Sequence, residues 1–184
     1  MKTSKAFEIR SLRGFTLVEL LTVVTIIVIL SALTVGAMGW VQKKAAVEKT
    51  RAQMALIENG LERYYSTAGV HPEVRDFNGL VCYKVLFGDG VGPDGILNTD
   101  DDTTPDGKPD PGATVYVAEL DPRTNSMKMV EPSGANAKPT KMVDAFGSPF
   151  RYAGGRYARQ NPDFDLYSSG PDGKFNTDDD INNW

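Results

Sequence analysis

The segment RGFTLVELLTVVTIIVILSALTVGAMGWV (residues 13–41) decides the fold of this chain of 184 residues. From residue 20 to residue 41 it holds no charged side chain, and such a run is long enough to cross the apolar core of a bilayer as a helix. Before it, four basic residues outnumber the single acid Glu8: Lys2, Lys5, Arg10 and Arg13. This bias predicts a single-pass segment with a cytoplasmic N-terminus and a C-terminal domain beyond the membrane.

Two kinds of N-terminal signal are compatible with an apolar run of this length. A secretory signal peptide would be cut after the run, where small residues occur at Ser31-Ala32 and at residues 35–37. The front of the run favours the other kind, because Arg13-Gly14-Phe15-Thr16-Leu17-Val18-Glu19 resembles the processing signal of type IV pilins and pseudopilins. The resemblance implies that a prepilin peptidase cuts between Gly14 and Phe15 and methylates the new amine of Phe15.

Glu19 is the one carboxylate at the start of this apolar helix. A charged side chain within a membrane is costly and usually marks a partner or a pathway, although one close to the boundary can reach the headgroups. The resemblance implies that Glu19 pairs with the N-terminal amine of a neighbouring subunit and sets the axial register of a filament. A proline is usual in the middle of the family's helix, and Gly36 stands at the matching position. Gly36 and Gly39 could each loosen the helix, at a cost of about 1 kcal/mol relative to alanine.

Helical spacing continues beyond Trp40, which is placed for the membrane interface. Charged residues lie mainly off an apolar stripe, so the helix is predicted to cover a soluble domain and to end at Gly69, before Pro72. The stripe consists of Val47, Met54, Ile57, Leu61, Tyr64, Tyr65 and Ala68.

The rest of the chain reads as short strands between turns rich in Pro, Gly and Asn. Strands are predicted at residues 114–120, 127–130, 149–152 and 164–168, and the run at residues 80–87 is compatible with a helix or a buried strand. The fold class is therefore α+β, with a long N-terminal helix packed on a small antiparallel sheet. The only cysteine, Cys82, cannot form an intramolecular disulfide and is expected to be a buried, inert thiol.

Two C-terminal segments, DAFGSPFRY (residues 144–152) and FDLYSSG (residues 164–170), resemble the sheet of major pseudopilins of type II secretion systems. The resemblance extends over residues 13–74 and 144–184, favours a helix at residues 80–87, and implies a pilin-like fold. True type IV pilins usually close a C-terminal loop with two cysteines, which this chain lacks.

The resemblance also implies a domain plan, a location and partners. Residues 1–14 are the cytoplasmic leader, 15–41 the transmembrane and assembly helix, 42–68 the amphipathic helix, and 69–184 a periplasmic α+β domain with acidic loops at 88–112 and 170–180. The chain is expected to be anchored in the inner membrane and to assemble into a homo-oligomeric filament, a periplasmic pseudopilus that helps folded proteins move outward. Its partners would be prepilin peptidase, the inner-membrane secretion platform and minor pseudopilins.

An acidic sequence occurs twice: GPDGILNTDDD (residues 92–102) and GPDGKFNTDDD (residues 170–180) differ only at the two residues after the second glycine. Adjacent aspartates repel one another unless a cation offsets them, and calcium prefers six to eight oxygen ligands. The second copy stands where major pseudopilins hold a structural calcium ion, so its predicted ligands are Asp172, Asp178, Asp180, Asn176 and Ser169, with backbone oxygens near Ser168 and Ser169 completing the shell. For the first copy, a second ion held by Asp94, Asn98, Asp100 and Asp102 and a solvated acidic turn remain equal alternatives, and Asp106 and Asp110 extend the acidic patch without ligand spacing.

Composition disfavours two other classes of function. The formal net charge of −4 offers no general attraction to nucleic acid. The single histidine, His71, follows Val70 in a predicted loop without a nucleophile pattern nearby, so it is expected at the surface or at a helix end, and the chain is not expected to be an enzyme. A pilin-like subunit for adhesion or DNA uptake and a membrane-tethered calcium-binding module are the alternatives to a pseudopilin.

Overall fold

The computed structural model describes residues 14–184, apart from the side chains of residues 34–37. It divides into two compact units, Met1–Gln42 and Lys43–Trp184, which are treated separately below. The predicted leader lies outside the described residues except for Gly14, and the side-chain surroundings of Gly36 also lie outside them.

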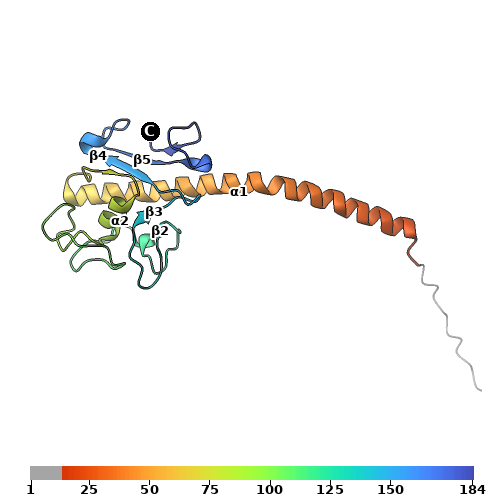
Figure 1. The fold of residues 1–184 in the computed structure, drawn as a ribbon, viewed down its shortest axis with the longest axis horizontal. Coiled ribbons are helices and arrows are strands. Elements are labelled where there is room, and N and C mark those ends of the chain that lie inside the picture. Colours follow the sequence, from red (N-terminus) through yellow and green to blue (C-terminus); the bar gives the residue numbers. More distant parts are fainter. Residues whose placement is uncertain (1–13) are drawn as a thin grey trace, which may run out of the picture. The chain divides into compact units, whose positions relative to one another are not determined.

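The first element is the helix α1, Leu17–Ala68 (Figure 1). Its N-terminal part is long and apolar enough to cross a membrane, by length and composition, with a mean hydropathy of 2.5 over its most apolar window. Its C-terminus is the predicted one: Gly69 has φ 75° and donates its N–H to the carbonyl of Tyr65 at 2.8 Å. A glycine in this left-handed conformation is a common way to end a helix.

The C-terminal half of α1 buries the apolar stripe in the core of the second unit. Met54, Ile57, Leu61 and Tyr64 are at most 3% exposed, as the helical spacing predicted. Tyr65 is the exception, because it is 46% exposed and stacks on His71 with ring centroids 4.7 Å apart. Its assignment to the core was wrong.

Residues 80–87 form a helix, α2 (Leu80–Phe87), as the resemblance implied. It begins after Gly79 and ends at Gly88, both in the left-handed conformation, and the buried carboxylate of Asp76 accepts the N–H of Val81 at 2.7 Å. Cys82 on this helix is 1% exposed, which confirms a buried thiol, and burial raises the pKa of that thiol well above its ordinary value.

The strands form two antiparallel sheets where one was expected. The larger has the order β1-β4-β5-β6, with β1 Arg75–Asp76, β4 Arg151–Gly154, β5 Phe164–Ser168 and β6 Ile181–Asn182. Its register pairs Arg151 with Tyr167 and Tyr152 with Leu166. The smaller sheet pairs β2 (Val130–Glu131) with β3 (Lys141–Met142). In Figure 1 the β4–β5 sheet and the α2, β2 and β3 group lie on different sides of the C-terminal half of α1.

The strand predictions succeed in part. β5 has the predicted bounds, β4 begins two residues later than predicted, and β2 overlaps only the last residue of 127–130. Residues 114–120 are not a strand, because Tyr116 and Val117 donate their N–H groups to the carbonyl of Leu86 at the end of α2, at 2.9 and 3.0 Å, and a 3-10 turn follows at Ala118–Leu120. The N–H groups of this segment that a neighbouring strand would bond are therefore already bonded to the carbonyl of Leu86 in α2.

Candidate functional site

Glu19 closes the first turn of α1 in a reciprocal arrangement with Thr16. The Glu19 Oε2 atom accepts the Thr16 N–H and the Thr16 hydroxyl, both at 2.8 Å, and the Thr16 Oγ1 atom accepts the Glu19 N–H at 3.2 Å. This is a capping box, which satisfies two backbone donors at a helix start. Among the described residues nothing donates to Oε1, so one carboxylate oxygen is available to a partner.

The second acidic loop, residues 170–180, is a closed turn held by its own side chains. Asp179 Oδ2 accepts the N–H of Asp172 at 3.1 Å, and Asp180 Oδ2 accepts the N–H of Asn176 at 2.8 Å. Gly170 and Asn176 are left-handed, with φ 59° and 68°. A Cβ on Gly170 would lie 2.0 Å from the carbonyl oxygen of Asp179, so only glycine allows the loop to close this tightly.

The first acidic loop, residues 92–102, repeats this geometry. Asp94 N–H donates to Asp101 Oδ2 at 3.5 Å, Asn98 N–H donates to Asp102 Oδ2 at 2.8 Å, and Asn98 has φ 66°. In both loops a threonine hydroxyl, Thr99 or Thr177, bonds the middle aspartate at 2.6 or 2.8 Å. The sequence repeat is therefore a repeat of structure.

The predicted calcium ligands are only partly brought together. Asp172 and Asp178 are both exposed, but Asp172 Oδ1 accepts the N–H of Lys174 at 2.7 Å and the Thr177 hydroxyl at 3.4 Å, whereas Asp178 accepts no hydrogen bond from residues 14–184. Within that same range no three acidic, histidine or cysteine side chains are grouped closely enough to hold an ion. Sequence reasoning missed Asp179, the carboxylate that reaches across the loop, because a run of three aspartates does not show which one faces inward.

Ser169 is the strongest indication of an ion at the second loop. Its side chain is fully buried, and its Oγ atom has no hydrogen-bond partner, which is unfavourable for a buried hydroxyl. No lysine or arginine in the described part of the chain pairs with a carboxylate of this loop, whereas the first loop has Lys84 Nζ 3.9 Å from Asp102 Oδ2. An all-oxygen donor set with an unsatisfied hydroxyl fits calcium.

Further acids in residues 88–112 bind the backbone rather than a shared ion. Asp110 Oδ2 accepts three consecutive N–H groups, those of residues 90–92, at 2.8 to 2.9 Å. Asp89 is 1% exposed and accepts the Tyr83 hydroxyl at 2.5 Å and the N–H groups of Asp106 and Gly107 at 2.9 Å. Asp110, predicted to extend the acidic patch, is thus also an internal acceptor of this long loop.

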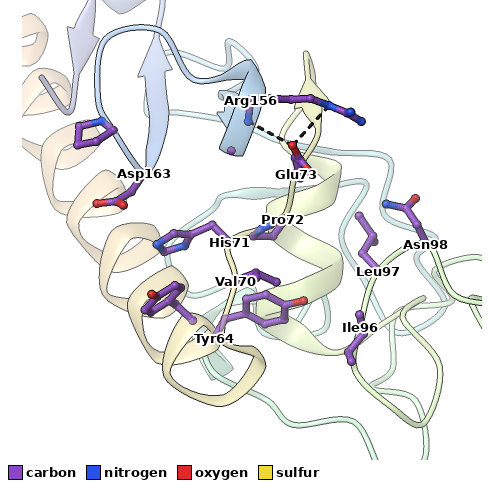
Figure 2. A pocket seen from close by; sticks show the side chains of 14 residues that line it. Tyr64, Val70, His71, Pro72, Glu73, Ile96, Leu97, Asn98, Arg156 and Asp163 are labelled. Carbon is purple, nitrogen blue, oxygen red and sulfur yellow. Dashed lines mark hydrogen bonds and ion pairs between the residues drawn. The ribbon is translucent and has the colours of Figure 1, made fainter.

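His71 was expected at the surface or at a helix end, and the structure places it just beyond Ala68, the last residue of α1. Its side chain is 7% exposed and lies between two aromatic rings, with centroids 4.7 Å from Tyr65 and 4.9 Å from Phe164. It lines a cavity of about 590 Å³, and Figure 2 shows Ile96, Leu97 and Asn98 on the side away from Asp163. Arg156 and Glu73 at its rim form an ion pair at 3.4 Å. The aromatic neighbours of His71 explain its burial.

The sequence at the start of the chain matches a known family. Residues 9–35 match the family described as "Prokaryotic N-terminal methylation motif". The chain carries a prokaryotic N-terminal methylation motif. The methylation motif covers Gly14, Phe15 and Glu19, and it confirms the resemblance to type IV pilins and pseudopilins at the N-terminal signal.

Among solved structures, a similar one is the major pseudopilin from the type 2 secretion system of enterohaemorrhagic Escherichia coli. The identity is 19%, the match covers 80% of this chain and 94% of the other, and the TM-score is 0.39. No curated protein matches the chain. The long helix and small antiparallel sheet confirm the predicted α+β fold class.

Proposed function

We propose that this protein is a structural subunit of a pseudopilus in a type II secretion system, assembled from the inner membrane after prepilin peptidase removes residues 1–14. The observation that carries the proposal is the methylation motif at the front of an apolar helix that continues into the folded domain. A helix shared with the domain cannot be discarded like a secretory signal. The subunit contributes packing and register rather than catalysis, and its domain lies on the periplasmic side.

Processing is tested by intact-mass analysis of protein purified from the native membrane. The expected mature chain begins at N-methylated Phe15. A mature protein that keeps residues 1–14, or one that is cut after residue 37, would contradict the proposal.

Assembly through Glu19 is tested by three substitutions, because capping and charge pairing make different demands. Glu19→Gln keeps an oxygen for the capping box but removes the charge, whereas Glu19→Ala and Glu19→Lys remove both. If the charge pairs with the amine of a neighbour, all three proteins insert into the membrane and none forms filaments. Filaments formed by Glu19→Gln alone would show that capping is the role of this residue, and filaments formed by Glu19→Lys would refute an assembly role.

A structural calcium ion in the second loop belongs to the same proposal. Asp172, Asp180 and Ser169 would supply side-chain oxygens and Asp178 and Asn176 could complete the set, while the ion would offset carboxylates that have no basic partner in the described structure. A second ion in the first loop, held by Asp94, Asn98, Asp100 and Asp102, has less support because Lys84 already lies beside Asp102.

A further inference from the structure

The outer face of the four-stranded sheet carries arginine and aromatic side chains. Arg151 and Tyr167 are cross-strand partners and therefore share a face, opposite to the buried pair Tyr152 and Leu166. Arg75 on β1 is paired with Ala153, two residues along β4 from Arg151, and so belongs to the outer face as well. We call this surface the Arg–aromatic face, defined by Arg75, Phe77, Arg151, Arg159, Tyr167 and Trp184.

The aromatic rings of this face are held in fixed positions, yet they are not covered. The Arg151 Cζ atom lies 3.4 Å from the ring centroid of Phe175 and 5.5 Å from that of Phe77. Tyr167 packs edge-on against Trp184, with centroids 5.7 Å apart. Phe77 and Trp184 nevertheless remain 58% and 50% exposed, beside a hollow of about 340 Å³. Preformed arginine and aromatic clusters of this kind typically dominate binding energy at protein interfaces.

The unpaired positive charges of the Arg–aromatic face favour an acidic partner. Arg75, Arg151 and Arg159 form no ion pair within residues 14–184, and the Nε atom of Arg151 is buried without a hydrogen-bond partner. Two carboxylates also line the hollow, but both are engaged. Asp165 is buried and accepts N–H groups of residues 159–161, and Asp180 accepts that of Asn176.

The tip of the first acidic loop has the complementary chemistry. Ile96 is 44% exposed there, and Asp94 and Asp100 of the same loop are also exposed residues. The second loop cannot substitute, because Lys174 stands at the position of Ile96 and Phe175 is already packed against Arg151. The two residues that distinguish the repeats thus give the first loop an exposed isoleucine and give the second loop Phe175, which packs against Arg151 of the Arg–aromatic face.

We propose that the tip of the first acidic loop of one copy, Ile96 between Asp94 and Asp100, docks on the Arg–aromatic face of a second copy of this chain. Every copy carries both surfaces, so the contact is heterologous and can repeat along an open assembly. Ile96 enters the aromatic hollow, and the two carboxylates face the unpaired arginines, which fixes register and orientation. The inference rests on the proposed self-assembly and adds a contact outside the membrane helix.

The test is a disulfide cross-link between copies of the full chain. One chain carries Ile96→Cys and the other, with a different tag, carries Phe77→Cys, while the native Cys82 is buried. Because each chain has one exposed cysteine, a product with both tags must join two copies. After mild oxidation of co-expressing membranes, we expect this mixed dimer at about tenfold the level obtained when exposed Asn136→Cys replaces Ile96→Cys.

Charge reversal tests the same cross-link through the charges of the two surfaces, with the cysteines unchanged. Asp100→Arg or Arg159→Asp should each lower the mixed dimer about fivefold, and the two together should restore it, whereas Asp106→Arg, outside the tip, should leave it unchanged. A mixed dimer no more abundant than the Asn136→Cys control overturns the inference. If filaments still form in that case, the proposed function stands without this contact. If neither the mixed dimer nor filaments form, both the contact and the proposed function are refuted.

Discussion

At the scale of single residues, buried and half-buried carboxylates organise the loops of this domain. Asp76, Asp89 and Asp110 each accept two or three backbone N–H groups, and all of these donors except Val81 in the first turn of α2 lie in loops or turns. Backbone donors in loops must be satisfied like those in helices, and a charged acceptor does this more strongly than a neutral one. Part of the acidic composition is therefore structural.

Asp110→Asn should destabilise the domain by roughly 2 kcal/mol, because an amide oxygen replaces a charged acceptor of three N–H groups. Thermal unfolding of the full chain in detergent, followed by near-ultraviolet circular dichroism, measures this. Asp100→Asn is the matched control, since Asp100 is exposed, and it should change stability by less than about 0.5 kcal/mol. Equal effects of the two substitutions would contradict a structural role for Asp110.

Asp76 gives a prediction about pH. Burial raises the pKa of its carboxyl, and the N–H groups of Asn78 and Val81 offset part of that rise. A raised pKa means that the folded state binds the proton more tightly than the unfolded state. The resulting contribution of Asp76 to the free energy of unfolding is complete below about pH 3.9 and is lost as pH rises through the folded-state pKa. The destabilisation caused by Asp76→Asn should therefore shrink between pH 4 and pH 7. A cost that grows over this range would show that the hydrogen bonds outweigh burial.

At the scale of elements, the sequence specified the long ones and missed the short ones. Helix α1 and strand β5 follow from periodicity and composition, because many residues along each contribute to the pattern. Strands β1, β3 and β6 have two residues each, too few to show a period. The segment 114–120 has strand-like residues, but its donors bond Leu86, a tertiary contact that no local pattern encodes.

The same distinction applies to the candidate sites. The methylation motif and the repeat were legible because they are contiguous. The burial of His71 depends on Phe164, which is distant in the sequence, and the Arg–aromatic face depends on the register between β4 and β5. Neither relation is visible before the chain is folded.

Two glycines of the second acidic loop allow a test of its closure. Gly170 and Gly173 both have positive φ, so alanine at either position costs about 1 kcal/mol in backbone conformation. Only at Gly170 would the new Cβ also collide with the backbone, at the carbonyl of Asp179. Gly170→Ala should therefore cost about 3 kcal/mol and Gly173→Ala about 1 kcal/mol in thermal unfolding. Similar costs at both positions would mean that the loop opens without a penalty.

At the scale of the whole molecule, an apolar helix and a folded domain share one continuous element. Helix α1 runs through the division between the two units at residues 42 and 43, so the proposed processing at its start would leave the helix joined to the domain. Conditions that stabilise the domain should then increase the amount of subunit that can assemble, because an unfolded domain cannot present its surfaces to a neighbour. Calcium is the condition that the second loop predicts.

Calcium should raise the melting temperature of the full chain in detergent, and a chelator should remove the increment. An ion that binds only the folded state adds about 2.7 kcal/mol when its free concentration is a hundredfold above Kd, which corresponds to roughly 8 °C for a domain of this size. Magnesium should give a smaller shift, because it keeps much of its water and prefers fewer protein ligands.

The final prediction concerns which oxygens bind the ion, and Ser169→Ala separates the two accounts of the loop. If the buried Ser169 hydroxyl is a ligand, its removal reduces the calcium-dependent shift; if no ion binds, removal of an unsatisfied hydroxyl leaves stability unchanged or improved. Asp178→Ala with Asp180→Ala should abolish the shift, whereas Asp100→Ala with Asp102→Ala reports on the first loop alone. Asp180 also bonds the Asn176 N–H, so the difference between calcium and chelator is the readout rather than the absolute melting temperature. Identical melting of the unsubstituted protein with calcium and with chelator would leave both loops as acidic turns held by their own hydrogen bonds.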